Sequence, residues 1–284
     1  MIASFHPCIV ADVNLLCAGR KPDPNDLDVI QSATAVILPQ GCRQDLYEMA
    51  RGHCAHVFPN YDARFSHTGK MGQIRLFQEQ GVSFPKTVLY SDIETFFKET
   101  DNGHILPFHP PFVVKLNWGG EGETVFLIEN VDVWMRQLQD IRRYEVGGQS
   151  GFMLQAYIPS DGKTLRIAVI GHKLISYWRI QPDGNNFFSC IAKGAVIDKC
   201  AYPELQRRAT AAVWELCQKT RIDLAGFDVI FSSDSNDPEP LFLEINYFFG
   251  RQGLGGSEAY YALLVEQVNL WIRNIGLMDE TVCL

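Results

Sequence analysis

The chain has 284 residues, of which 46% are hydrophobic and 20% charged, which is enough for about two or three compact lobes with sizeable cores. Its formal net charge of −8 argues against a surface that binds duplex nucleic acid. The cysteines form no C-x-x-C pair, and no apolar run reaches the length of a membrane-spanning helix. The start of the chain lacks the basic and apolar regions of a signal peptide. We therefore expect a cytoplasmic protein that binds neither nucleic acid nor membrane.

Residues 1–65 are predicted to form a small N-terminal α/β lobe. Segments typical of strands alternate with one typical of a helix, in the order Pro7–Leu16, Ala33–Leu38, Arg43–Arg51 (the helix) and Ala55–Phe58. Such alternation is typical of a small parallel sheet. The lobe carries no readable substrate motif.

Residues 66–111 are predicted to be a helical and extended linker region. Apolar residues at helical intervals indicate a helix over Thr68–Gln80. A second helix is expected over Ser91–Glu99, with Ser91 as its N-cap. Lys70 stands at the start of the first helix and, taken alone, is most simply a surface residue.

Residues 112–155 are predicted to form a small lobe around a Gly-rich hairpin. The strand Phe112–Leu116 is apolar except for Lys115, and a returning strand is expected over Thr124–Ile128. A lysine inside such a strand needs an anionic partner or loses its charge, unless it extends from an edge strand. The turn holds three glycines within four residues, so that backbone N–H groups can converge on an anion such as phosphate. Its residues are Trp118, Gly119, Gly120, Glu121 and Gly122.

Residues 156–284 are predicted to form a large lobe. Two strands, a long amphipathic helix, an acidic hairpin and a closing helix are expected in turn. The strands and helices are Leu165–Ile170, Lys173–Ile180, Pro203–Thr220 and Glu258–Ile275. Arg166 and Arg179 lie in the two strands and Lys193 follows them. Each could be a surface cation, or could hold phosphates and stabilise transferring charge.

The acidic hairpin of the large lobe carries the most informative pattern in the chain. Apolar runs at 226–231 and 241–246 flank a polar turn, and pairing that is symmetric about the middle of the turn sets Asp228 opposite Glu244. Facing carboxylates repel each other, and a divalent cation removes that repulsion. Asn246 shares a face with Glu244, which completes three oxygen ligands suited to magnesium.

The same pattern allows a simpler interpretation, a solvated hairpin face with scattered acids, but each acid lies inside an apolar run. Strand alternation further predicts that Leu243 and Ile245 share the opposite face. If repulsion dominates in the free protein, at least one carboxyl has a raised pKa. Replacing Asp228 by Asn is then expected to leave the free protein's stability intact.

The order of these motifs resembles the ATP-grasp family, and most nearly its RimK-like branch of carboxylate–amine ligases, over about residues 66–275. The resemblance rests on the ordered set and on no single motif. The set comprises Lys115 with its Gly-rich turn, Leu154–Ile158, Thr164–Gly171, Lys193-Gly194, Gly226–Asp228 and Leu243–Asn246. It implies an α/β protein of ATP-grasp fold, in which two α+β lobes clamp ATP and a small N-terminal α/β lobe lies in front.

The resemblance also implies roles for individual residues. Lys70 and Lys115 would contact ATP phosphates under the turn from Trp118 to Gly122, and Asp161 would face the ribose hydroxyls. The backbone of Gln155, Ala156, Tyr157 and Ile158 would face adenine. Arg166, Arg179 and Lys193 would steady the transferring charge, and Asp228, Glu244 and Asn246 would hold Mg²⁺ or Mn²⁺. Thr164 stands where the branch has an acid, and an aromatic, Gly-rich turn follows Asn246, so the substrate stays open.

The implied activity is an ATP- and Mg-dependent carboxylate–amine ligase that acts on amino acids or peptides through an acylphosphate. An ATP-dependent small-molecule kinase of the same fold is an alternative, and a non-catalytic nucleotide-binding protein is another. The expected partners are a small-molecule or peptide carboxylate and an amine. The sequence is compatible with a homo-oligomer and does not fix the oligomeric state.

Overall fold

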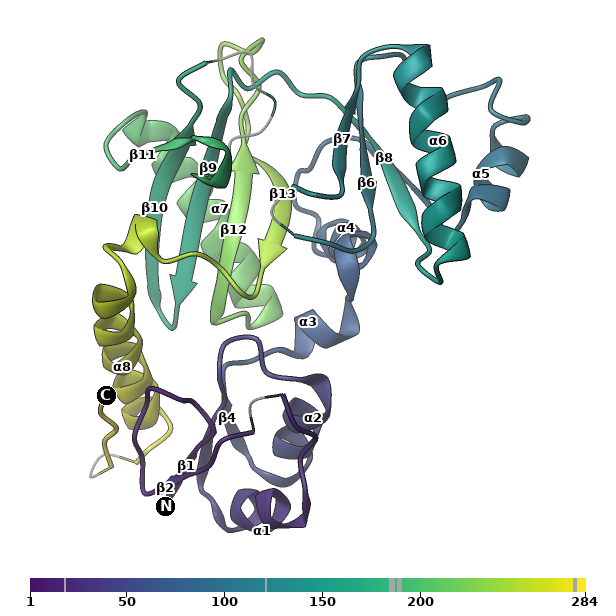
Figure 1. The fold of residues 1–284 in the computed structure, drawn as a ribbon. Helices are drawn as coiled ribbons and strands as arrows, with labels where there is room; N and C mark the ends of the chain where they lie inside the picture. The colour runs from purple at the N-terminus through teal and green to yellow at the C-terminus, as the bar shows by residue number, and fades with distance from the viewer. Residues whose placement is uncertain (18, 121, 184–186, 188–190, 278–279) are drawn as a thin grey trace.

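The protein folds into three sheets, each of which organises one lobe (Figure 1). The computed structural model describes residues 1–17, 19–120, 122–183, 187, 191–277 and 280–284. The N-terminal lobe lies below the other two in Figure 1, near both chain ends, and the Met1 amino group is 3.4 Å from Glu280 Oε1. The mixture of helices and sheets agrees with the predicted α/β class.

The N-terminal lobe is built on a four-stranded parallel sheet in the order β2-β1-β3-β4. Its elements are β1 (Ile2–Ser4), β2 (Val13–Asn14), α1 (Pro24–Ser32), β3 (Ala35–Ile37), α2 (Gln44–His53) and β4 (His56–Phe58). The predicted first strand over Pro7–Leu16 is confirmed only at Val13–Asn14, which is the second strand, because the buried run Ile2–Ser4 is the first and pairs on both sides. The sequence analysis also overlooks α1, although Asp23 and Asp26 form a capping box at its start.

The segment predicted as a linker is divided between the two other lobes. It contains α4 (Gly69–Gln80), β5 (Thr87–Tyr90) and α5 (Ile93–Glu99), after the short α3 (Asp62–Ser66). Apolar side chains of α4 pack into the core of the large lobe, whereas β5 pairs with β8 (Phe152–Ala156) in the small lobe. The N-cap of α5 is Asp92, which accepts the Thr95 N–H at 2.7 Å. The predicted cap Ser91 instead donates its hydroxyl to Asp92.

The small lobe is a four-stranded antiparallel sheet in the order β5-β8-β6-β7, with α5 and α6 beside it in Figure 1. Its remaining elements are β6 (Phe112–Leu116), β7 (Val125–Ile128) and α6 (Val131–Val146). Phe96, Trp134 and Phe152 lie in the core between helices and sheet. Because β6 lies between β7 and β8, Lys115 is on an interior strand and does not extend from a sheet edge.

The large lobe is a five-stranded antiparallel sheet in the order β11-β10-β9-β12-β13. Its elements are β9 (Lys163–Ile170), β10 (Lys173–Ile180), β11 (Val196–Asp198), α7 (Pro203–Thr220), β12 (Leu224–Ile230), β13 (Leu241–Asn246) and α8 (Ser257–Asn274), with two 3₁₀ turns at Ile191–Lys193 and Gln252–Leu254. Helix α7 shares one core with this sheet and α4, while α8 shares a second core with the sheet and the N-terminal lobe.

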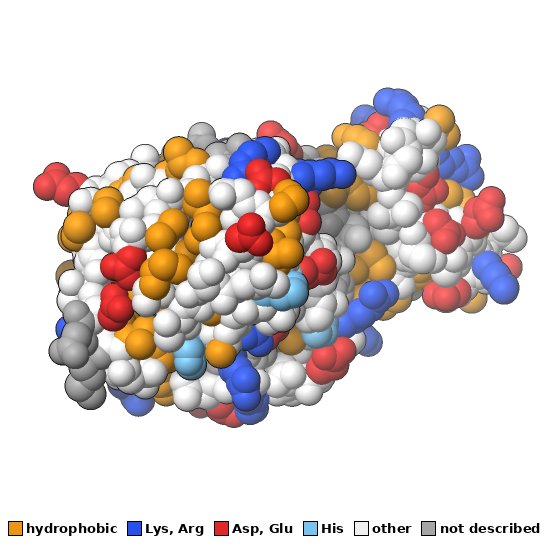
Figure 2. Space-filling model, turned by 90° about the horizontal axis from the view of Figure 1, so that it is seen from below, with side chains coloured by type: hydrophobic (Ala, Val, Ile, Leu, Met, Phe, Trp, Pro, Cys, Tyr) orange, Lys and Arg blue, Asp and Glu red, His pale blue; other side chains and the backbone are white. Residues whose placement is uncertain are grey.

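These shared cores join the N-terminal and large lobes into one body. The small lobe projects from that body at the right of Figure 2. In the part of the chain that the structure describes, no helix is both long enough and apolar enough to cross a membrane.

Candidate active site

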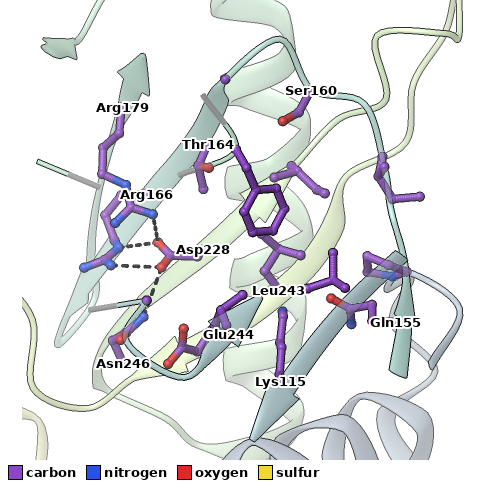
Figure 3. A pocket seen from close by; sticks show the side chains of 18 of the residues that line it. Lys115, Gln155, Ser160, Thr164, Arg166, Arg179, Asp228, Leu243, Glu244 and Asn246 are labelled. Carbon is purple, nitrogen blue, oxygen red and sulfur yellow. Dashed lines mark hydrogen bonds and ion pairs between the residues drawn. The ribbon is translucent and has the colours of Figure 1, made fainter. Parts of the chain in front are cut away.

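A pocket of about 810 Å³ lies between the small-lobe sheet and the large-lobe sheet (Figure 3). It brings together most of the predicted site residues, namely Lys115, Gly122, Gln155, Ala156, Tyr157, Ile158, Asp161, Arg166, Arg179, Asp228, Glu244 and Asn246. Among the described residues, the pocket lining does not include Lys70, Trp118, Gly119, Gly120 or Lys193. Glu121 lies outside the described residues.

Lys115 is the cation of the small-lobe wall. Its side chain is 8% exposed and lies between Glu244 and Gln155 in the view of Figure 3. Within the described part of the chain it makes no hydrogen bond or ion pair. Burial lowers the pKa of Lys115 from 10.5 to about 8, although the nearby Glu244 carboxyl opposes the shift. An ammonium with unused donors beside an open pocket is suited to bind an anion.

Asp228 is the centre of a buried charge cluster on the large-lobe wall (Figure 3). Arg166 donates through Nε to Oδ1 at 2.5 Å and through Nη2 to Oδ2 at 3.0 Å. Arg179 Nη2 lies 2.8 Å from Oδ1, and the Asn246 amide donates to Oδ2 at 3.1 Å. Burial alone would raise the pKa of Asp228, but the two guanidiniums hold it at about 2. The expectation that repulsion governs this carboxylate in the free protein is therefore wrong.

Glu244 faces Asp228 across the hairpin, as the sequence predicts. Burial raises the pKa of the Glu244 carboxyl and the Asp228 charge raises it further, while Lys70 and Lys115 oppose the rise. The predicted increase in pKa therefore falls on Glu244. In the described residues no hydrogen bond or ion pair engages its carboxyl, so its oxygens stay available.

A β-bulge next to this pair changes which side chains face the pocket. Asp228 pairs with Glu244 but Val229 pairs with Phe242, which leaves Leu243 as the extra residue. As a result Phe242 and Ile245 both enter the core, while Leu243 and Glu244 both line the pocket. The predicted sharing of one face by Leu243 and Ile245 is wrong, because strict alternation ends at the bulge.

The end of β8 and the segment that follows it form the wall opposite the charge cluster. Gln155 is buried and donates its side-chain amide to Thr87 Oγ1 at 2.8 Å, and the Ala156 N–H donates to Lys86 O at 2.8 Å. Asp161, in a left-handed conformation with φ 49°, lies 3.2 Å from Lys163 Nζ. Apolar side chains of both lobes complete the pocket lining, with Val113 and Val125 from the small lobe and Ile230 and Leu243 from the large lobe. The combination suits a flat heterocycle beside a polar sugar.

Lys70 and Lys193 do not line the pocket, although the resemblance implies that both act on ATP. Lys70 donates its ammonium to Trp118 O, Gly119 O and Thr124 Oγ1 at 2.9, 2.7 and 3.2 Å. It therefore holds the underside of the Gly-rich turn. Lys193 is exposed, and its carbonyl accepts the Gln181 side-chain amide at 3.1 Å. The roles of Lys70 and Lys193 toward ATP stay predictions.

Several pocket residues escape the sequence analysis. Tyr177 precedes Arg179 by two positions on β10, and this spacing could have placed both on one face. A Cβ at Gly253 would lie 2.1 Å from Tyr177 Cζ, so the turn after β13 packs directly on that ring. Phe248 belongs to the aromatic, Gly-rich turn that the sequence marks after Asn246, and it lines the pocket although 72% exposed.

A nucleotide-sized pocket between two α+β lobes is the arrangement of the ATP-grasp class. D-alanine–D-alanine ligase from Bacillus anthracis superposes with a TM-score of 0.59 at 14% identity, over 93% of this chain and 88% of that chain. A structure of the same enzyme complexed with ATP gives 0.59 at 16% identity, over 93% and 87%. The RimK domain protein from Sphaerobacter thermophilus DSM 20745 gives 0.53 at 16% identity, over 83% and 81%. At these identities the likeness shows the fold.

The family is shown by sequence. The model of the RimK-like ATP-grasp domain matches residues 68–262, so the chain belongs to this family and the predicted resemblance is confirmed. A relative in Xanthomonas oryzae pv. oryzae (strain MAFF 311018), named probable alpha-L-glutamate ligase, is 27% identical over 196 residues. The match covers 69% of this chain and 61% of that relative, less than two thirds of its length.

Proposed function

We propose that this protein is an ATP-dependent carboxylate–amine ligase that acts through an acylphosphate. The observation that supports this most is that Lys115 from one lobe and the Arg166–Arg179–Asp228 cluster from the other face the same pocket of about 810 Å³. Its size is suited to a nucleotide with a small acid beside the phosphates. Cations on both walls suit an anionic cosubstrate and a second anionic substrate.

The donor set of the large-lobe wall suits a divalent cation. Asp228 and Glu244 present carboxylates from paired strands, and Asn246 adds an amide. Hard ions such as Mg²⁺ take such oxygen ligands together with water and phosphate oxygens. When bound, the ion would neutralise charge on the β- and γ-phosphates. Since Asp228 is engaged by Arg166 and Arg179 in the free protein, at least one of these contacts would have to lengthen.

The residues of the pocket would support two steps. A substrate carboxylate oxygen attacks the γ-phosphorus, the bond to the β-phosphate oxygen breaks, and ADP leaves. Arg166 and Arg179 would stabilise the charge on the transferring group, while the Lys115 ammonium binds phosphate oxygens. An amine nitrogen then attacks the acyl carbon, the bond to the phosphate oxygen breaks, and the nitrogen loses a proton. Positioning carries most of this chemistry.

The test is product analysis in the presence of ATP and Mg²⁺. We would incubate the protein with a panel of amino acids and acidic peptides, beginning with L-glutamate because of the relatives' name, and measure ADP formation. Hydroxylamine should then trap the activated acid as a hydroxamate. A matched pair of variants, Glu244→Gln in the pocket and Glu239→Gln on the surface, should show loss and retention of turnover respectively.

A different product would overturn the proposal. Formation of ADP with a phosphate ester and no hydroxamate would identify a kinase with an alcohol acceptor. Tight nucleotide binding without ADP formation across the panel would identify a nucleotide-binding protein without turnover.

A further inference from the structure

Lys70 is buried and its ammonium is saturated by the small lobe's Gly-rich turn. Its side chain is 8% exposed, and its three acceptors, Trp118 O, Gly119 O and Thr124 Oγ1, lie within 3.2 Å. An ammonium has three donors, so none remains for a nucleotide while these contacts persist. Burial lowers the pKa of Lys70, which the Glu244 charge opposes. In the described residues no carboxylate forms an ion pair with it.

The contacts of Lys70 fix which way the peptide groups of the turn point. In a trans peptide the C=O of one residue and the N–H of the next point in opposite directions. Because the carbonyls of Trp118 and Gly119 are directed at Lys70, the N–H groups of Gly119 and Gly120 are directed away from it. Both glycines are exposed, and in the described part of the chain their N–H groups have no acceptor. The turn is thus held with the Gly119 and Gly120 N–H groups free on the side that faces away from Lys70.

Thr124 and Gly119 make further contacts that hold the Gly-rich turn beside Lys70. Thr124 donates its hydroxyl to Trp118 O at 2.5 Å, beside Lys70. A Cβ at Gly119 would lie 2.5 Å from Thr124 Cγ2, and the residue has φ +81°. Only glycine fits this close approach and this conformation without strain. The position of the turn therefore depends on a specific contact between Lys70, Thr124 and Gly119.

The helix that carries Lys70 is anchored elsewhere. Met71 and Phe77 of α4 pack in the core of the large lobe. Gln73 bonds both backbone groups of Ile245 at 2.8 Å, between the proposed metal ligands Glu244 and Asn246. The start of α4 also bonds Asn117, because the Met71 N–H donates to Asn117 Oδ1 at 2.9 Å. Helix α4 thus connects the acidic strand β13 with the base of the turn.

We propose that Lys70 is a positioning residue, which aims the Gly119 and Gly120 N–H groups at the nucleotide phosphates from a helix fixed on the large lobe. This inference rests on the proposed function, since it assigns the turn to phosphate binding. Direct contact between Lys70 and phosphate is the competing role, and the two roles differ in the free protein. A positioning residue orders the turn before nucleotide arrives, whereas a direct ligand need not.

The experiment compares Lys70→Met and Thr124→Val with wild type by NMR relaxation of the nucleotide-free protein. Both variants keep side-chain volume and remove hydrogen bonds of the turn. In Lys70→Met the order parameters of the Gly119 and Gly120 amides should fall from about 0.85 to below about 0.6, with a smaller fall in Thr124→Val. Lys173→Met, on an exposed lysine, is the control and should leave both unchanged.

Calorimetry with a non-hydrolysable ATP analogue and with AMP supplies the second readout. Affinity for the analogue should fall at least about tenfold in Lys70→Met, with AMP affinity nearly unchanged, because the proposal places the free N–H groups of the turn at the β- and γ-phosphates. Unchanged order parameters together with lost analogue binding would make Lys70 a direct ligand and overturn the proposal. If the wild type binds no nucleotide, the proposed function fails, while the relaxation data still report whether Lys70 orders the turn.

Discussion

The two walls of the pocket hold their charges in opposite ways. On the large-lobe wall, Asp228 is matched by Arg166 and Arg179 in the free protein. On the small-lobe wall, Lys115 is buried and, in the described residues, has no ionic partner. The Asp228 carboxylate therefore has its cationic partners without ligand. The small-lobe wall carries an uncompensated charge that an anion would neutralise, so we expect phosphate to bind at this wall.

Strand register is the physical origin of this difference. Arg166 and Asp228 are direct cross-strand partners on β9 and β12, so their side chains meet on one face. Lys115 has Val125 and Met153 as its cross-strand partners, and neither can compensate its charge. Four experiments test whether the two walls differ in this way.

The largest effect is expected from Asp228→Asn, which removes the ion-paired carboxylate of the large-lobe wall. It leaves two buried guanidiniums without their carboxylate, and breaking a buried ion pair from one side costs about 3–5 kcal/mol. Because Asn keeps one acceptor oxygen, we expect a loss of about 3 kcal/mol in the free energy of unfolding, measured with urea at pH 7. This reverses the expectation, drawn from the hairpin alone, that the free protein would keep its stability.

Asp237→Asn is the matched control, because it removes the same charge from an exposed pair with Arg208 and should change stability little. Asp228 has a folded pKa of about 2, below its ordinary 3.8, so its contribution is present above pH 3.8 and is lost as pH falls through about 2. The difference in the free energy of unfolding between wild type and Asp228→Asn should therefore shrink as pH falls from 3.8 to about 2. If wild type and Asp228→Asn are equally stable at pH 7, the ion pairs of Asp228 do not stabilise the free protein.

The second largest effect is expected from Lys115→Met, which removes the unpaired ammonium of the small-lobe wall. The variant keeps the stem and removes the ammonium, so affinity for a non-hydrolysable ATP analogue should fall by about 1.5–3 kcal/mol. The free protein should be as stable as wild type or more so, since a buried unpaired charge is removed. Calorimetry and urea unfolding measure the two quantities. Lys173→Met serves as the control, and unchanged affinity in Lys115→Met would leave Lys115 a structural residue.

A moderate effect is expected from pH. Lys115 has a pKa of about 8 in the free protein, and bound phosphates should raise it again. Below pH 8 the ammonium is already charged, whereas between pH 8 and 10.5 nucleotide binding should take up a proton and weaken as pH rises. In the same window the unfolded chain holds more protons, so the contribution of Lys115 to stability rises with pH.

Calorimetry at pH 8.5 in two buffers of different ionisation enthalpy measures that proton directly. Wild type should take up most of one proton on binding the ATP analogue, and Lys115→Met should take up clearly less. Equal uptake by both proteins would assign the proton to another group.

The smallest effect is expected from Asp161→Asn at the rim of the pocket. Its carboxylate is exposed and bonded to Lys163, so a contact with the ribose hydroxyls would be largely screened by water. We expect affinity for the ATP analogue to fall about two- to fivefold. The 2′,3′-dideoxy analogue should bind both proteins equally. If Asp161→Asn lowers the affinity for the ATP analogue and for its dideoxy form by the same factor, Asp161 acts by shaping its own loop and does not contact the sugar.

The family, the fold class and much of the local structure follow from the pattern of residues along the chain. Lys173–Ile180 and Pro203–Thr220 are found within their predicted bounds, because their apolar residues repeat with the period of a strand or a helix. The pairing of Asp228 with Glu244 also follows from the sequence, since one turn joins the two strands and limits their register. Most of the predicted site residues line the pocket, and they are predicted as motifs in a fixed order.

The partners of these charged residues, by contrast, depend on contacts between elements that are distant in the chain. Arg166 and Asp228 are 62 positions apart, and Lys70 is 48 from Trp118, so each contact depends on how separate elements pack. Lys70 and Lys115 look alike as lysines near glycines, yet Lys70 donates to two carbonyls and a hydroxyl, whereas Lys115 faces the pocket. The bulge at Leu243 likewise arises from sheet geometry. Periodicity fixes the face of a residue within its element, whereas packing between elements fixes its partner.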